Sequence, residues 1–167
     1  MLTEFKNLSP AEQQQLFDAI PLIVVLVAGA DGDIDEVELA EAQRLADIRS
    51  FNNRGHLNAY YEHIDEGLLG RIEQMINELP TDLEARQNAI FARLSLLNPV
   101  LAKMSEPFGY LYYQTFRSFA KHIAEAHGGF LRFLTIGPAE AEVLELPMLA
   151  PVARPSKVDY PDLPGIV

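Results

Sequence analysis

The stretch LIVVLVAGADGDIDEVELAEAQRLA, residues 22–46, decides the fold. It joins an apolar run to an acidic segment and then to an amphipathic pattern that is typical of a helix. The apolar run is rich in β-branched residues and would also suit a buried strand. A strand followed by a glycine loop and a helix would suggest nucleotide binding. GADGDI, however, matches neither GxGxxG nor a P-loop, and no second stretch has comparable strand character. We therefore predict a buried helix over residues 22–30 and an all-α fold, with a nucleotide-handling α/β protein as the alternative.

Helix signals recur along the rest of the chain. Ser9-Pro10-Ala11-Glu12 forms a capping box with proline at the first helical position, and Pro21 is expected to end or kink that helix. A second capping box begins at Thr81, and Asn98-Pro99 is expected to bend or break the helix that follows it. Further helices are predicted near residues 35–49, 56–64 and 68–79, from 105 until Gly128-Gly129, and from Gly137.

The helix expected from residue 105 carries an aromatic stripe, which at this spacing is typical of a core rather than of a ligand site. The stripe comprises Phe108, Tyr112, Phe116, Phe119 and Ile123, whereas Tyr110, Tyr113 and Arg117 lie on a different face. From Pro147 onward, five prolines fall in 21 residues, so this tail cannot be helical. We predict a single-domain bundle of about seven or eight helices over residues 1–147. An extended tail over residues 148–167 then lies along the domain or serves as a linker.

The acidic segment contains a candidate metal site. Asp31, Gly32, Asp33, Asp35 and Glu38 match the second half of an EF-hand calcium loop, with glycine at the turn and a bidentate glutamate at the end. Val27 and Gly29 stand at the two positions where such a loop normally starts with carboxylates, so this is half a site. The alternative is helix capping, because Asp35-x-x-Glu38 and Asp33-x-x-Glu36 both resemble capping boxes, and acids suit the first turn of a helix.

Composition restricts the partners. The net charge is −11, which disfavours nucleic acid and direct docking on anionic lipid. There is no cysteine, which removes disulfides, thiolate metal sites and cysteine nucleophiles. The N-terminus lacks the pattern of a cleavable signal, and the longest apolar run, residues 19–30, is shorter than the roughly 20 residues that span a bilayer. We expect a cytoplasmic protein without direct membrane insertion.

The chain contains a faint internal repeat. Residues 27–32 and 123–128 share an Ala-x-Ala spacing at a helix end, and Ile34 and Glu38 are echoed by Ile136 and Glu140. In the second copy of the repeat, six additional residues, 130–135, lie between Gly128-Gly129 and Ile136. His127 occupies the position at which the repeat predicts an acidic residue. The pattern predicts two pseudo-repeated helical hairpins that face each other across the core.

These residues, over roughly positions 10–147, resemble the TerB-like (tellurite-resistance protein B) family. The same fold is seen in the amino-terminal part of some membrane-anchored DnaJ-type co-chaperones. The resemblance implies an all-helical domain with acidic residues that bind a divalent metal. In this chain the candidate ligands are Asp31, Asp33, Asp35 and Glu38, for Ca²⁺ or another divalent cation. It also implies association with other stress-resistance proteins, often in a membrane-bound complex.

Catalytic patterns are missing from the sequence. His56, His63, His122 and His127 form neither HExxH nor the E-x-x-H pairs of a di-iron bundle, and no serine sits in a nucleophile elbow. Solvated or capping histidines are expected, and we predict that the chain is not an enzyme. The leading hypothesis is a helical interaction module with a cation site. Its alternative is a metal-free scaffold that docks proteins and uses the proline-rich tail as a tether.

Overall fold

The computed structural model describes residues 2–30, 34, 36–52, 57–126 and 143–162, and this part of the chain is all-α, without strands. A short 3-10 helix, η1, spans Thr3–Phe5. The helices that follow are α1 (Pro10–Ala28), α2 (Glu36–Asn52), α3 (Asn58–Asp65), α4 (Leu68–Glu78), α5 (Leu83–Ser95), α6 (Leu97–Lys103) and α7 (Phe108–Ala126). The second predicted hairpin, the end signal Gly128-Gly129 and the helix expected from Gly137 fall outside the described residues.

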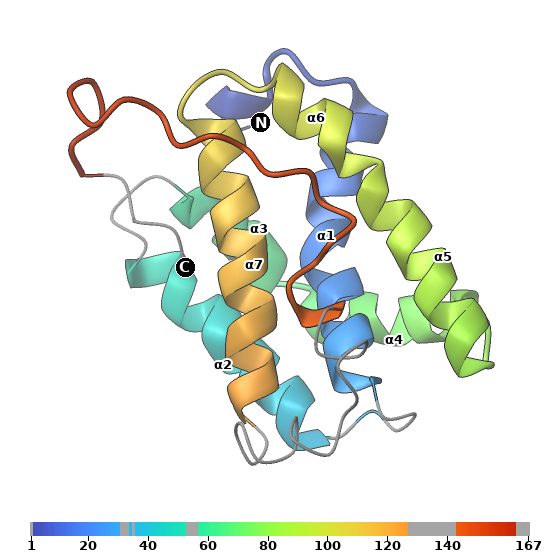
Figure 1. Cartoon of the computed structure of the whole chain (residues 1–167). Coiled ribbons are helices and arrows are strands. Elements are labelled where there is room, and N and C mark those ends of the chain that lie inside the picture. Colours follow the sequence, from blue (N-terminus) through green and yellow to red (C-terminus); the bar gives the residue numbers. More distant parts are fainter. Residues whose placement is uncertain (1, 31–33, 35, 53–56, 127–142, 163–167) are drawn as a thin grey trace.

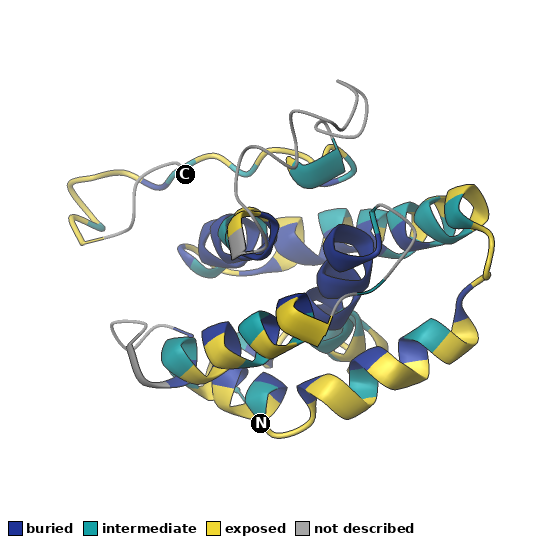
Figure 2. Cartoon of the chain, turned by 90° about the horizontal axis from the view of Figure 1, so that it is seen from below, coloured by how far each residue is buried: buried dark blue, intermediate teal, exposed yellow. Residues whose placement is uncertain are grey.

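Helix α1 is the centre of the bundle, and it contacts each of the helices α2 to α7 (Figure 1). The helix predicted over the apolar run is confirmed, because every residue from Ala19 to Ala28 is buried. Figure 2 shows the buried residues gathered on the inward faces of the helices, with exposed residues outside. Among the described helices, only α1 is long and apolar enough to cross a membrane, and most of it is enclosed by the bundle. The absence of direct membrane insertion therefore stays a prediction.

Pro21 was predicted to end or kink α1. The end does not occur, since the helix continues through this residue to Ala28, and the kink stays a prediction. A proline inside a helix costs about 3 kcal/mol, because it removes one hydrogen bond and crowds the preceding turn. Ala19 and Ile20 before Pro21 and all residues from Leu22 to Ala28 after it are buried, and each large apolar side chain removed from water contributes about 1.5–3 kcal/mol. Burial of the second half of α1 therefore outweighs the penalty at Pro21.

Two helix boundaries also differ from prediction. The N-cap of α5 is Asp82 rather than Thr81, and the Asp82 carboxylate accepts a hydrogen bond from the Ala85 N–H at 2.9 Å. The expected break at Asn98-Pro99 occurs earlier, because α5 ends at Ser95 and α6 begins at Leu97. Pro99 thus lies in the first turn of α6. Backbone N–H groups in the first turn have no acceptor within the helix, so the N–H that proline lacks costs no helical hydrogen bond.

The aromatic stripe of α7 is confirmed as core. Its residues from Tyr112 onward are fully buried, and Phe108 is half-buried. Tyr110 and Tyr113, expected on another face, are buried as well. Helix α7 packs against α1, α2 and α6, so more than one of its faces is covered.

The tail does not form a helix from residue 147 to 162, and its first part lies on the bundle (Figure 1). Leu146 and Leu149 belong to the hydrophobic core. The Asn98 side chain of α6 forms hydrogen bonds with the backbone at Met148 and Ala150. Of the two arrangements predicted for the tail, packing along the domain is the one that these residues adopt.

The start of α1 predicts a pH dependence of stability. Ser9 and Glu12 form the predicted capping box, and the Lys103 ammonium donates to both Glu12 carboxylate oxygens at 3.0 and 2.9 Å. The hydrogen bond from Lys103, followed by those from Ser9, lowers the pKa of Glu12 from 4.5 to about 2. Because the folded pKa is depressed, the contribution of Glu12 is fully present above pH 4.5 and is lost as the pH falls through about 2.

We therefore expect the urea midpoint of Glu12→Gln to fall less between pH 5 and pH 2 than that of the wild type. Gln can still accept the hydrogen bond from the Ser9 N–H, so the comparison isolates the charge. Parallel pH profiles of the two proteins would contradict the assignment.

Candidate functional site

The predicted metal ligands lie at the connection between α1 and α2. Asp31, Asp33 and Asp35 fall outside the described residues, so their arrangement around a cation stays a prediction. Glu38 is the fourth predicted ligand and lies in the first turn of α2. The structure therefore places one of the four residues and does not test their convergence.

Both ends of this connection are packed against the bundle. The Gly29 N–H donates to the Val25 carbonyl at 3.1 Å and closes α1. The Arg86 guanidinium of α5 donates to the Gly29 carbonyl at 3.4 Å. A Cβ atom on Gly29 would lie 3.4 Å from the Cγ1 atom of Ile34, which itself packs against the core. Gly29 and Ile34 thus lie close together.

Glu38 is buried, with only 5% of its surface exposed, whereas Glu36 and Val37 in the same turn are exposed. Burying a carboxylate is expensive, and buried charges in proteins are paired or coordinate metal ions. Glu38 stands four residues before Ala42 and seven before Leu45, both of which are buried, so the helical period places it on the inward stripe of α2. That spacing is the sequence signal that would have predicted its burial.

A second carboxylate follows one turn later on α2. The Glu41 carboxylate accepts a hydrogen bond from Arg44 at 2.8 Å, and one of its oxygens lies 3.0 Å from Nε2 of His122 on α7. The hydrogen bond from Arg44, with a smaller contribution from His122, holds the pKa of Glu41 below its usual value. Sequence reasoning expected His122 to be solvated or to cap a helix, and it missed this link between α2 and α7. Within the described residues, no three acidic or histidine side chains lie close enough together to hold a metal ion.

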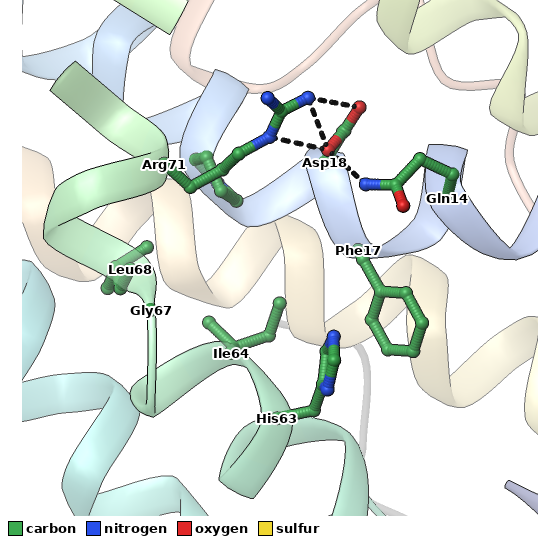
Figure 3. Close-up of a pocket in the computed structure, with 9 residues that line it drawn as sticks. Gln14, Phe17, Asp18, His63, Ile64, Gly67, Leu68 and Arg71 are labelled. Carbon is green, nitrogen blue, oxygen red and sulfur yellow. Dashed lines mark hydrogen bonds and ion pairs between the residues drawn. The ribbon is translucent and has the colours of Figure 1, made fainter. Parts of the chain in front are cut away.

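A separate cavity of about 150 Å³ opens between α1, α3 and α4 (Figure 3). Its apolar wall comprises Phe17, Pro21, Ile64 and Leu68. The His63 ring lies against Phe17, with 4.0 Å between the ring centroids. A cavity of roughly this volume can enclose a six-membered ring, so it suits a single side chain or a small apolar group.

An ion pair borders the same cavity. The Arg71 guanidinium donates to both oxygens of Asp18 at 3.0 Å, and the Gln14 amide donates to Asp18 at 2.8 Å (Figure 3). The hydrogen bond to Asp18 raises the pKa of Arg71, so the guanidinium stays charged. The described residues that line the cavity include no hydroxyl, thiol or amine nucleophile. That the chain is not an enzyme stays a prediction.

Comparison of the chain with models of protein families finds no match. Searches of curated proteins and of solved structures also find none. The TerB-like assignment therefore rests on the residues quoted from the sequence and stays a prediction.

Proposed function

We propose that the chain is a TerB-like helical interaction module whose acidic loop, residues 31–38, binds Ca²⁺ or a similar hard divalent cation. The observation that carries the proposal is the burial of the Glu38 carboxylate at the entrance to α2. The close approach of Gly29 and Ile34, on either side of Asp31 and Asp33 in the sequence, supports it as well.

Burial distinguishes a ligand from an acid that acts on the helix macrodipole alone. Such an acid can act from an exposed position, and Glu36 in the same turn is exposed. A glutamate at the last position of a calcium loop instead directs both oxygens inward to the ion. Glu38 has the burial that this second role requires.

The proposed partners are other proteins, and the TerB-like resemblance suggests a membrane-bound stress-resistance complex. The net charge of −11 supports protein partners over nucleic acid, since phosphate binding requires clustered cations. A cytoplasmic location fits such a role.

Calorimetric titration with Ca²⁺ tests the cation site. We expect one ion to bind per chain, and Glu38→Gln and Asp31→Asn to weaken binding by tenfold or more, which is about 1.4 kcal/mol. Glu36→Gln is the matched control, because it removes the same charge from an exposed position in the same turn. Its affinity should stay within about threefold of the wild type, since a nearby exposed charge is worth less than 1 kcal/mol.

Absence of heat at millimolar Ca²⁺ would contradict the proposal. Equal losses in Glu36→Gln and Glu38→Gln would also contradict it, because they would show a diffuse attraction by net charge rather than ligation.

A metal-free docking module is the second candidate function, and the cavity between α1, α3 and α4 favours it. An apolar wall beside an ion pair is suited to one anchoring side chain of a partner protein. The tether that was part of this hypothesis is less well supported, because Leu149 and Pro155 of the tail are buried on the bundle.

A further inference from the structure

The cavity between α1, α3 and α4 has the size and the walls of a site for one small ring. Its volume is about 150 Å³, and a cavity of roughly this size holds one benzene molecule. Phe17, Ile64 and Leu68 contribute apolar side chains to its wall. The His63 ring stands beside Phe17, and the ion pair of Asp18 and Arg71 lies on the opposite side (Figure 3). A ring in this space therefore gains apolar contacts with both α1 and the helices that face it.

The ion pair makes a charged ligand unfavourable. The Arg71 guanidinium donates to both Asp18 oxygens at 3.0 Å, so each charge already has its counterion. A ligand anion would be repelled by the Asp18 carboxylate, and a ligand cation would be repelled by the Arg71 guanidinium. Taking a charge out of water without a free partner is expensive. The cavity therefore suits a neutral ligand.

Two side chains at the cavity keep a hydrogen-bond acceptor that no described residue uses. The Gln14 amide nitrogen donates to Asp18 at 2.8 Å, but its carbonyl oxygen accepts no hydrogen bond from the described residues. The His63 ring packs against Phe17, with 4.0 Å between the ring centroids, and its nitrogens form no hydrogen bond with the described residues. A neutral imidazole has one acceptor nitrogen, so a ligand hydroxyl can donate to it.

The surroundings of the cavity favour a small molecule over a protein. Protein-binding sites are marked by contiguous exposed apolar patches. The exposed residues that line the cavity are polar or glycine, namely Gln14, His63 and Gly67. The large apolar side chains that are exposed elsewhere in the described part of the chain do not line it; they are Val37, Leu69, Leu96 and Val158. A ligand that fits within the cavity needs no such patch around it.

We propose that this cavity binds a neutral monocyclic aromatic molecule with one hydroxyl group, that is, a simple phenol. The ring packs against Phe17, Ile64 and Leu68, and the hydroxyl donates to His63, whose own ring is positioned by its contact with Phe17. The inference is independent of the cation site. It places a small molecule where the second candidate function would place a side chain of a partner protein.

Titration of the full chain, followed by amide chemical shifts, tests the proposal. The probes are phenol, toluene, benzoate and benzylamine, which share one ring and differ in the attached group. We expect saturable shifts at Gly67 and Leu68 with a Kd of about 1 mM for phenol, within the range for a ligand of this size. Toluene should bind about three times more weakly, because it cannot form the hydrogen bond. Benzoate and benzylamine are charged at pH 7.5 and should bind roughly ten times more weakly or less.

Gly67→Leu tests the location of the site. Gly67 lines the cavity, and a Cβ atom there would meet nothing within 4 Å, so leucine adds bulk at the cavity without a backbone clash. Phenol should bind this variant about fivefold more weakly or less, the usual cost of overpacking. Gly70→Leu is the matched control, because Gly70 is equally open but does not line the cavity. Its affinity for phenol should equal that of the wild type.

His63→Leu tests the hydrogen bond, and it should bind phenol and toluene equally. Because His63 is exposed, this variant also keeps the test valid if Gly67→Leu does not fold. Shifts that do not saturate would overturn the proposal, as would tighter binding of benzoate or benzylamine than of phenol. Equal affinity of the wild type for phenol and toluene, or unchanged phenol binding by Gly67→Leu, would also overturn it. Tighter binding of N-acetyltyrosine amide than of phenol would assign the cavity to a partner's side chain instead.

Discussion

Arg49→Met is expected to destabilise the protein by about 2–4 kcal/mol, because hydrogen bonds from a charged donor contribute about 1.5–3 kcal/mol and ring contacts add to them. The Arg49 guanidinium on α2 donates to the Tyr61 hydroxyl at 2.9 Å and to the Thr115 hydroxyl at 3.0 Å. It also donates to the Ser118 hydroxyl at 2.9 Å. It lies 5.6 Å from the centre of the Tyr61 ring and 5.2 Å from that of Phe119. One side chain thus joins α2, α3 and α7.

Urea denaturation of two further variants identifies the cause. Arg49→Lys keeps the charge but not the planar fork, so it should recover only part of the loss. Arg44→Met removes an exposed arginine of the same helix, whose bond to Glu41 is a surface ion pair, and should shift the urea midpoint much less than Arg49→Met does. A loss below 1 kcal/mol for Arg49→Met, or a full recovery with Lys, would contradict this role of the guanidinium.

Gly109→Ala is expected to destabilise the protein by about 1–3 kcal/mol, the usual penalty for overpacking a dense interior. Gly109 lies in the first turn of α7, against the end of α6. A Cβ atom there would lie 2.5 Å from the Leu101 carbonyl oxygen and 3.4 Å from its carbon. These are backbone atoms, so α6 and α7 would have to move apart to admit the methyl group.

Gly70→Ala is the matched control. Gly70 lies inside α4, and a Cβ atom at this position would meet nothing within 4 Å. Alanine there should stabilise the helix by about 0.5–1 kcal/mol through its better helix propensity. Thermal unfolding of the two variants should therefore shift in opposite directions, and a shift of the same sign would contradict the close approach of α6 and α7.

The all-α class could be predicted from the sequence because the apolar run at residues 22–30 had no partner strand. Of the end or kink predicted at Pro21, the end does not occur, for a reason that local rules do not contain. Proline propensity describes a single turn, whereas the burial that keeps α1 continuous comes from helices far away in the sequence. The choice of Asp82 over Thr81 as N-cap is a local competition between adjacent capping residues, and both satisfy the same rule.

The candidate sites were less predictable. Glu38 and Arg49 both lie on the stripe that contains Ala42 and Leu45, and helical spacing could have placed them inward. The interaction partners could not be predicted from the sequence, because Arg49 contacts α3 and α7 only after the chain has folded. The cavity beside Asp18 and Arg71 likewise joins residues that are 53 positions apart. The packing of the tail on the bundle shows a local signal in retrospect, since Leu146, Leu149, Val152 and Pro155 repeat every three residues.

The cation site at the entrance to α2 is the central claim, and a crystal structure of the wild type grown in saturating Ca²⁺ tests it most directly. The account predicts one ion with both Glu38 carboxylate oxygens about 2.3–2.6 Å away and with the aspartates of residues 31–35 completing its ligands. A structure in which Glu38 stays buried against the protein alone, with no ion near it at saturating Ca²⁺, would contradict the account.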